Sequence, residues 1–195
     1  MDYNEKDVWA ELQEVNGLIN DGLLQKMRLD RARMLAEKGL TGLACADGLY
    51  NHATADCCEQ IHFIQHLLKL NGAGFLLGLD PNYFEGRQRE YLKAARIALL
   101  YDLEVSFHYL KKGSTVFVLS HAPNCGQRAH FGLSLWEMLV ATHRAHEVVV
   151  EKLKIQHNLV IPILMVDRDY GNGHDPEIEL YVIKHDLIGK NDVSL

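Results

Sequence analysis

Apolar residues along this chain form short continuous runs, and longer segments between them carry apolar residues at helical spacing. The continuous runs, each of strand length, are residues 40–46, 74–79, 115–120, 159–166 and 179–183. The segments with helical spacing are residues 54–70, 83–111 and 133–156. Continuous apolar strands that alternate with helices are typical of a parallel sheet covered on both faces. The pattern therefore predicts an α/β fold with a mostly parallel central sheet of about five strands flanked by helices.

Residues 5–38 come before the first predicted strand and also carry apolar side chains at helical spacing. They predict one or two helices, with a possible break at residues 20–22, Asn-Asp-Gly. We therefore divide the chain into an N-terminal helical arm, residues 1–38, and an α/β core domain, residues 39–195. An arm of this kind can pack on a partner subunit and make a homodimer or higher homo-oligomer. Packing on its own domain is an equally good interpretation.

Pro162 interrupts the fourth predicted strand. Proline has no N–H to donate to a neighbouring strand, so it is found in edge strands or at bulges. The sequence thus predicts that residues 159–166 form an edge strand or carry a bulge.

Composition narrows the class of protein. A hydrophobic content of 48% with only four prolines among 195 residues is typical of a globular protein with a sizeable core. The formal net charge of −6 argues against nucleic-acid binding. No apolar run approaches the ~20 residues that span a bilayer, so we expect no membrane association.

The polar first residues lack a signal-like apolar core, which predicts a cytoplasmic protein. In that compartment the four cysteines are more typical of thiols or metal ligands than of disulfides.

Potential metal ligands follow the first and third predicted strands. Cys45 and Asp47 close the first strand, and His121 and Cys125 close the third. Sites in open α/β sheets form outside the carboxyl ends of the strands, and thiolate, imidazole and carboxylate are all zinc ligands. The sequence therefore predicts zinc bound by these four residues. The alternative is that Cys45 is a small buried hydrophobic residue, as most free cysteines are.

These two segments resemble the motifs of the β-class carbonic anhydrases. That family carries Cys-x-Asp-Ser-Arg after its first strand and Gly-His-x-x-Cys-Gly after a later one, in a similar order of helices and strands. The resemblance implies that Cys45, His121 and Cys125 bind zinc. It also implies that Asp47 either ligates the metal or gives way to water, and that the substrate is CO2, bicarbonate or a similar small molecule.

The chain departs from these motifs at two places. Leu49 stands where the family has the arginine that holds the aspartate away from the metal, and three residues instead of two separate His121 from Cys125. Without that arginine, Asp47 could stay bound and close the site. Arg168, just after the fourth predicted strand, could bind an anion or replace the missing arginine. A local ion pair is an equally good interpretation of Arg168.

Two further groups carry potential ligands or proton carriers. Cys58, His62 and His66 recur at intervals of four residues, so a helix over 54–70 would place them on one face, with Cys57 beside them. Such a row more often forms a half-buried helix face than a metal site. His143 and His146 could form a proton relay, since histidine titrates near neutrality, but a solvated helix face is the more common arrangement.

Three functions follow from these observations. The first is a carbonic anhydrase-like zinc lyase, in which zinc-bound hydroxide attacks CO2 or a related carbon compound, with Asp47 and Arg168 as the catalytic residues. The second is a catalytically silent zinc-binding homologue in which Asp47 closes the metal site. The third is a metal-free dimeric interaction protein. Zinc content separates the third from the other two, and CO2 hydration separates the first from the second.

Overall fold

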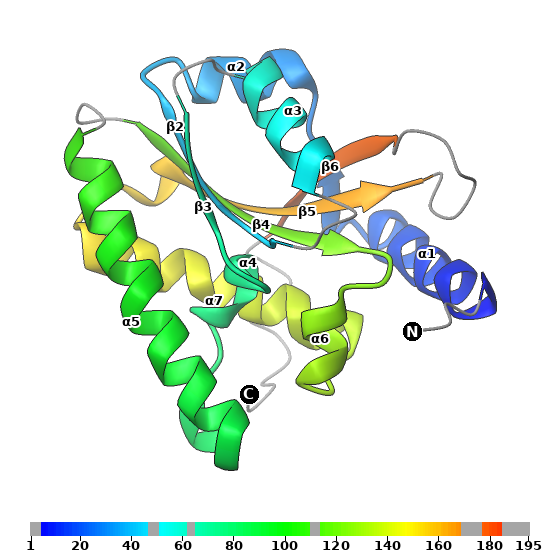
Figure 1. The fold of residues 1–195 in the computed structure, drawn as a ribbon. Coiled ribbons are helices and arrows are strands. Elements are labelled where there is room, and N and C mark those ends of the chain that lie inside the picture. The colour runs from blue at the N-terminus through cyan, green and yellow to red at the C-terminus, as the bar shows by residue number, and fades with distance from the viewer. Residues whose placement is uncertain (1–4, 47–50, 62–64, 110–113, 169–176, 185–195) are drawn as a thin grey trace.

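Three layers make up the fold in the computed structural model: a six-stranded sheet lies between two groups of helices (Figure 1). The structure describes residues 5–46, 51–61, 65–109, 114–168 and 177–184. The strands are β1 (Leu24–Lys26), β2 (Leu40–Ala44), β3 (Gln65–Lys69), β4 (Thr115–Ala122), β5 (Val160–Asp167) and β6 (Ile178–Ile183). Their order across the sheet is β1-β6-β5-β4-β2-β3. The α/β class, the flanking helices and the mostly parallel sheet are as predicted.

Four adjacent strands, β3, β2, β4 and β5, are parallel, and β6 and β1 extend the sheet in antiparallel fashion. The helices are α1 (Glu5–Asn20), α2 (Leu29–Leu35), α3 (Asn51–Ile61), α4 (Ala73–Leu76), α5 (Gly86–Tyr109), α6 (Gly126–His130) and α7 (Leu135–Leu153). Two 3-10 turns, η1 (Pro81–Tyr83) and η2 (His157–Leu159), complete the described elements. In Figure 1, α2 and α3 cover one face of the sheet, and α4, α5 and α7 cover the other.

Alternate residues of the strands build two separate cores, one on each face of the sheet. In β4, Val116 and Val118 belong to the core beneath α4, α5 and α7, whereas Phe117 and Leu119 belong to the core beneath α2 and α3. Every residue of β4 is buried. This burial on both faces explains why the strand reads as an unbroken apolar run in the sequence.

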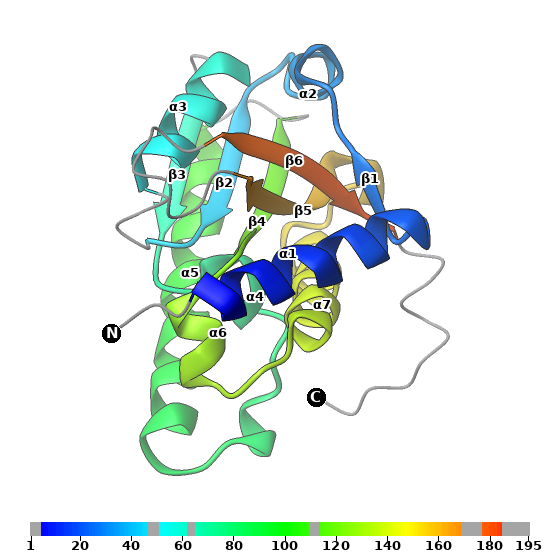
Figure 2. The same cartoon turned by 90° about the vertical axis from the view of Figure 1, so that its right-hand side faces the viewer.

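Helix α1 packs against its own chain. Val15 is fully buried in the core that α7 covers, and Leu12, Leu18 and Ile19 pack against it. Figure 2 shows α1 crossing the molecule below β5 and β6. The arm therefore packs on its own domain, which is one of the two arrangements that the sequence allowed. Dimerisation stays a prediction. Residues 24–26, which we predicted to be helical, form the edge strand β1 and pair with β6.

Two predicted elements between residues 54 and 79 are wrong. Helix α3 ends at Ile61, and residues 65–69 form the edge strand β3. The apolar run at 74–79 is not a strand, because its first residues belong to the short helix α4. A Cβ on Gly74 would lie 1.9 Å from the carbonyl oxygen of Leu119, so α4 rests directly on β4. A helix buried this deeply is apolar on all sides, and periodicity cannot distinguish it from a buried strand.

The prediction that Pro162 lies in an edge strand or at a bulge is also wrong. Strand β5 has β4 on one side and β6 on the other, and its pairing with β4 runs in unbroken register from Val160 to Val166. Pro162 pairs with Val118 of β4, but the pairing of β5 with β6 begins one residue later, at Ile163. The proline is tolerated because it occupies the part of β5 that has a registered partner on one side only. Among the described residues, no helix is long and apolar enough to cross a membrane.

Candidate metal centre

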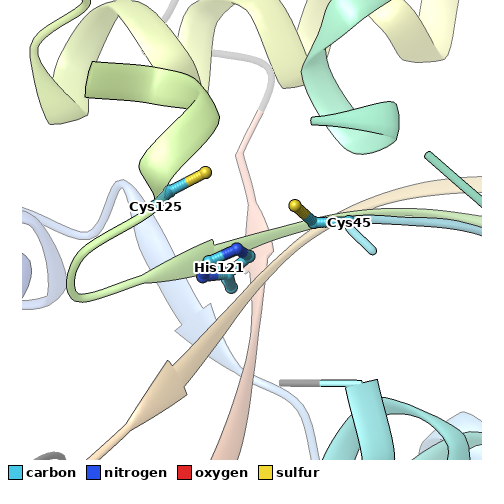
Figure 3. Close-up of side chains that lie close together, drawn as sticks. All are labelled: Cys45, His121 and Cys125. Carbon is cyan, nitrogen blue, oxygen red and sulfur yellow. The ribbon is translucent and has the colours of Figure 1, made fainter. Parts of the chain in front are cut away.

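Three of the predicted ligands meet at the carboxyl edge of the parallel strands. Cys45 directly follows β2, His121 lies near the end of β4, and Cys125 directly precedes α6. One ligand atom from each residue lies within 4.8 Å of the other two. In Figure 3 the sulfur atoms of Cys45 and Cys125 point toward one another, with the ring of His121 beside them.

The sheet itself brings Cys45 and His121 together. Strands β2 and β4 are adjacent and parallel, with Ala44 paired to Leu119. Cys45 directly follows this pair, and His121 lies two residues beyond it in β4, which continues beside β5 to Ala122. Both ligands therefore lie at the carboxyl edge of two adjacent parallel strands, where sites form in open α/β sheets. A short loop then returns Cys125 to that edge. In this loop Asn124 adopts a left-handed conformation, with φ of 67°.

Helix α1 holds the loop that carries Cys125. The Asn124 backbone N–H donates to Oε2 of Glu11 at 3.1 Å, and Nη2 of Arg128 donates to the same oxygen at 2.6 Å. The side chains of Glu11 and Arg128 are only 10% and 16% exposed, so this ion pair is shielded from water. This contact could not be predicted from the sequence, because Glu11 and Arg128 are far apart in the chain.

A backbone N–H also points at the metal ligands. The N–H of Gly72 donates to Sγ of Cys45 at 3.1 Å. Gly72 has a φ of 78°, and an added Cβ would meet Cγ of Gln127 at 2.7 Å and Cζ of Phe75 at 2.9 Å. A residue with a side chain therefore does not fit here. A role for Gly72 was not predicted from the sequence, where the only sign of it was that the residue is a glycine.

The electrostatics of the two sulfur atoms are coupled. A hydrogen bond from the Cys125 thiol lowers the pKa of Cys45, burial opposes it, and interactions with His121 and Gly72 lower it further. The same bond to Cys45 raises the pKa of Cys125, and burial raises it again. These opposite shifts favour the thiolate at Cys45 and the thiol at Cys125. A cation bound between the sulfur atoms would favour the loss of the Cys125 proton as well.

The donor set fits a thiophilic metal ion. Cys45, His121 and Cys125 are 3%, 0% and 1% exposed. Two thiolates and one imidazole are the ligands of several zinc sites, and soft sulfur donors favour zinc or copper(I) over magnesium or calcium. Three protein ligands leave one position of a tetrahedral ion for a fourth group.

The two residues that we predicted to be catalytic are placed differently. Asp47 lies outside the described residues. Arg168, one residue beyond β5, donates to Oε2 of Glu179 at 2.6 Å, to Oδ1 of Asn16 at 2.9 Å and to the hydroxyl of Tyr181 at 2.7 Å. Arg168 therefore forms an ion pair, with Glu179, which was the second of the two interpretations of this residue.

The second group of cysteines and histidines is divided between two elements. Cys57 and Cys58 lie in α3, His66 lies in β3, and His62 lies outside the described residues. The predicted row on one helix face is wrong because α3 ends before His66. Burial raises the pKa of Cys57 to about 11 and that of Cys58 to about 12, so both stay protonated thiols at neutral pH. His143 and His146 lie on α7 in a separate group with Glu147.

Comparison of the chain with protein-family models, with curated protein sequences and with solved structures gave no match. The class of protein is therefore defined by its fold and site alone. It is an α/β protein with a six-stranded, mostly parallel sheet. At the carboxyl edge of that sheet, a buried group of two cysteines and one histidine could hold a metal ion.

Proposed function

We propose that this protein is a zinc-dependent lyase that hydrates CO2 or a similarly small carbon compound. The observation that carries the proposal is the convergence of Cys45, His121 and Cys125 within 4.8 Å at the ends of two adjacent parallel strands. These are the residues that the resemblance to β-class carbonic anhydrases assigns to zinc. Zinc with three protein ligands supplies a Lewis acid that lowers the pKa of water to about 7, and so provides hydroxide at neutral pH.

The chain's own residues would set the charge and polarity of such a site. Two thiolates, from Cys45 and Cys125, would offset the double positive charge of zinc. Both cysteines belong to the apolar core that also contains Phe84 and Phe131. An apolar, neutral surrounding favours a small uncharged substrate over a phosphate or a large polar one. Asp47, two residues after Cys45, is the proposed proton acceptor.

A silent zinc-binding homologue is the second candidate, and the contacts of Arg168 favour it. In the related enzymes an arginine holds the aspartate of the motif away from the metal. Here Leu49 takes that arginine's position in the motif, and Arg168 is bound to Glu179, Asn16 and Tyr181. With Arg168 held by these partners, Asp47 would be unrestrained and would ligate zinc as the fourth group.

Stopped-flow measurement of CO2 hydration between about pH 6 and 9 tests the proposal, because water on zinc titrates near pH 7. We expect a rate that rises with pH in the zinc-loaded protein and that is lost in Cys125→Ser. Cys58→Ser is the matched control, because Cys58 is an equally buried thiol outside the site. Zinc bound without hydration activity at any of these pH values would contradict the enzyme and favour the silent homologue.

Asp47→Asn distinguishes the two candidates. If Asp47 closes the site, the substitution weakens zinc retention and leaves hydration as weak as before or raises it. If Asp47 accepts a proton in the reaction, the substitution lowers the hydration rate by ~10²-fold or more and leaves zinc content unchanged. The paired measurement is zinc content and hydration rate on the same preparation.

A further inference from the structure

A second group of potential metal ligands lies on α7, apart from Cys45 and its neighbours. His143, His146 and Glu147 stand at positions i, i+3 and i+4, so they share one side of the helix. One ligand atom from each lies within 4.8 Å of the other two. His157 of η2 lies over this group, with its ring centroid 5.4 Å from that of His146 and its Nδ1 3.6 Å from Oε2 of Glu147.

The contacts of His146 favour one tautomer. Its Nε2 lies 3.3 Å from the backbone carbonyl oxygen of His157. A carbonyl can only accept, so a hydrogen bond here requires the hydrogen on Nε2. In the neutral ring Nδ1 then presents a lone pair, and it lies 3.1 Å from Oε1 of Glu147. A lone pair and a carboxylate oxygen at this distance repel unless a positive charge lies between or beside them. That charge is either a second proton on His146 or a metal ion.

We propose that His143, His146 and Glu147, with His157 as a fourth ligand, bind a divalent transition-metal ion. Two or three imidazoles with one carboxylate suit ions of intermediate softness such as Zn²⁺, Co²⁺ and Ni²⁺, whereas Mg²⁺ and Ca²⁺ prefer oxygen. A tetrahedral ion with bonds of about 2.0–2.1 Å separates its ligand atoms by about 3.3 Å. The 3.1 Å between His146 and Glu147 is close to that separation.

The carbonyl contact of His146 is itself typical of metal sites. Histidines that bind metals usually donate their other ring N–H to a carboxylate or a backbone carbonyl, which fixes the ring in place. The site would join α7 to η2, the turn that leads into β5. It therefore lies toward the amino end of the parallel strands, whereas Cys45, His121 and Cys125 lie at the carboxyl end. Occupancy of one site does not require occupancy of the other.

Cobalt titration of the full chain tests the proposal, because thiolate ligands give Co²⁺ a charge-transfer band that imidazole and carboxylate do not. We expect one equivalent of Co²⁺ with this band, at Cys45 and Cys125, and a second equivalent without it. His143→Gln and His146→Gln should lose the second equivalent alone. His157→Gln, at an exposed position, should weaken the second equivalent at least about 10-fold. The control is His108→Gln, an exposed histidine of α5, which should change neither.

If a variant at a buried histidine fails to fold, nitrogen-15 NMR of the histidine rings in the wild-type protein tests the same proposal. In the wild-type protein, added Zn²⁺ should shift the Nδ1 resonance of His146 and leave Nε2 protonated. The proposal is overturned if Nδ1 of His146 carries a proton that Zn²⁺ does not displace. It is equally overturned if no second equivalent of Co²⁺ binds at high micromolar concentration, or if folded His146→Gln or His157→Gln binds the second equivalent as the wild type does.

Discussion

Cys45 and Cys125 are potential metal ligands whose burial is energetically unfavourable when no metal is bound. The hydrogen bond between the two buried sulfur atoms lowers the pKa of Cys45 and raises that of Cys125, so the pair favours a thiolate at Cys45. A buried charge has a high cost unless it is paired. A divalent cation supplies that pairing, so metal binding is expected to stabilise the folded chain.

We predict that Cys125 is a direct ligand of the metal ion. Cys125→Ser should lower zinc affinity by more than ~100-fold, because even residues that only contact a ligand contribute 10–100-fold. Competition with a chromogenic chelator measures the change. Cys58→Ser, at a buried position in the opposite core, should retain wild-type affinity. Equal zinc affinity in the two variants would remove Cys125 from the site.

At the scale of elements, α1 acts on the site through one side chain. Glu11 accepts hydrogen bonds from Asn124 and Arg128 and so fixes the loop before Cys125. We predict that Glu11→Gln lowers zinc affinity by ~10–100-fold, the range for residues that orient a ligand. Asp7→Asn, at an exposed position of the same helix, is the control. If Glu11→Gln binds zinc as tightly as the control does, α1 has no part in the site.

Strand β6 carries a charge network that should respond to acid. Burial raises the pKa of Glu179, but hydrogen bonds from Lys26, Arg168 and Tyr181 outweigh it and lower the pKa to about 2. The ordinary value is 4.5, so Glu179 favours the folded state fully above pH 4.5. This contribution is lost as the pH falls from 4.5 toward 2.

Urea unfolding of Glu179→Gln measures this contribution. At pH 7 the substitution should lower the free energy of unfolding by up to about 1 kcal/mol, the usual range for partly exposed ion pairs. Near pH 2 the wild type and the variant should differ by less. A difference that stays constant from pH 7 to pH 2 would show that the charge on Glu179 does not stabilise the fold.

The sequence predicts some of these elements and cannot predict others. Strands β4 and β5 are buried on both faces, so their apolar runs are unbroken and easily recognised. Strand β3 lies at the edge of the sheet, and its residues 66–69 are only half-buried, so the polar residues in its sequence obscured it. The three ligands were predictable because each follows or ends a recognisable strand. Gly72 and Glu11 were not, since their contacts with the site arise only when distant segments fold together.

At the scale of the whole molecule, α1 is integrated into the fold of its own chain, with Val15 fully buried. Trp9 of the same helix is 66% exposed. Dimerisation through the arm, expected from the sequence, stays a prediction. Light scattering at micromolar concentration should give twice the chain mass of 22.1 kDa if it is correct. A Trp9→Ser variant should then dissociate, and a wild-type mass of 22.1 kDa would contradict the prediction.

Metal analysis of the whole protein tests the central claim most directly. The protein should be purified with zinc present and dialysed, and zinc measured by elemental analysis, with anomalous scattering used to place the ion in crystals. We predict an ion within about 2.0–2.3 Å of Cys45, His121 and Cys125, and the loss of one equivalent of zinc in Cys125→Ser. We expect this site to bind zinc as tightly as other thiolate sites do. A zinc content below about a tenth of an equivalent per chain would contradict the proposed metal centre.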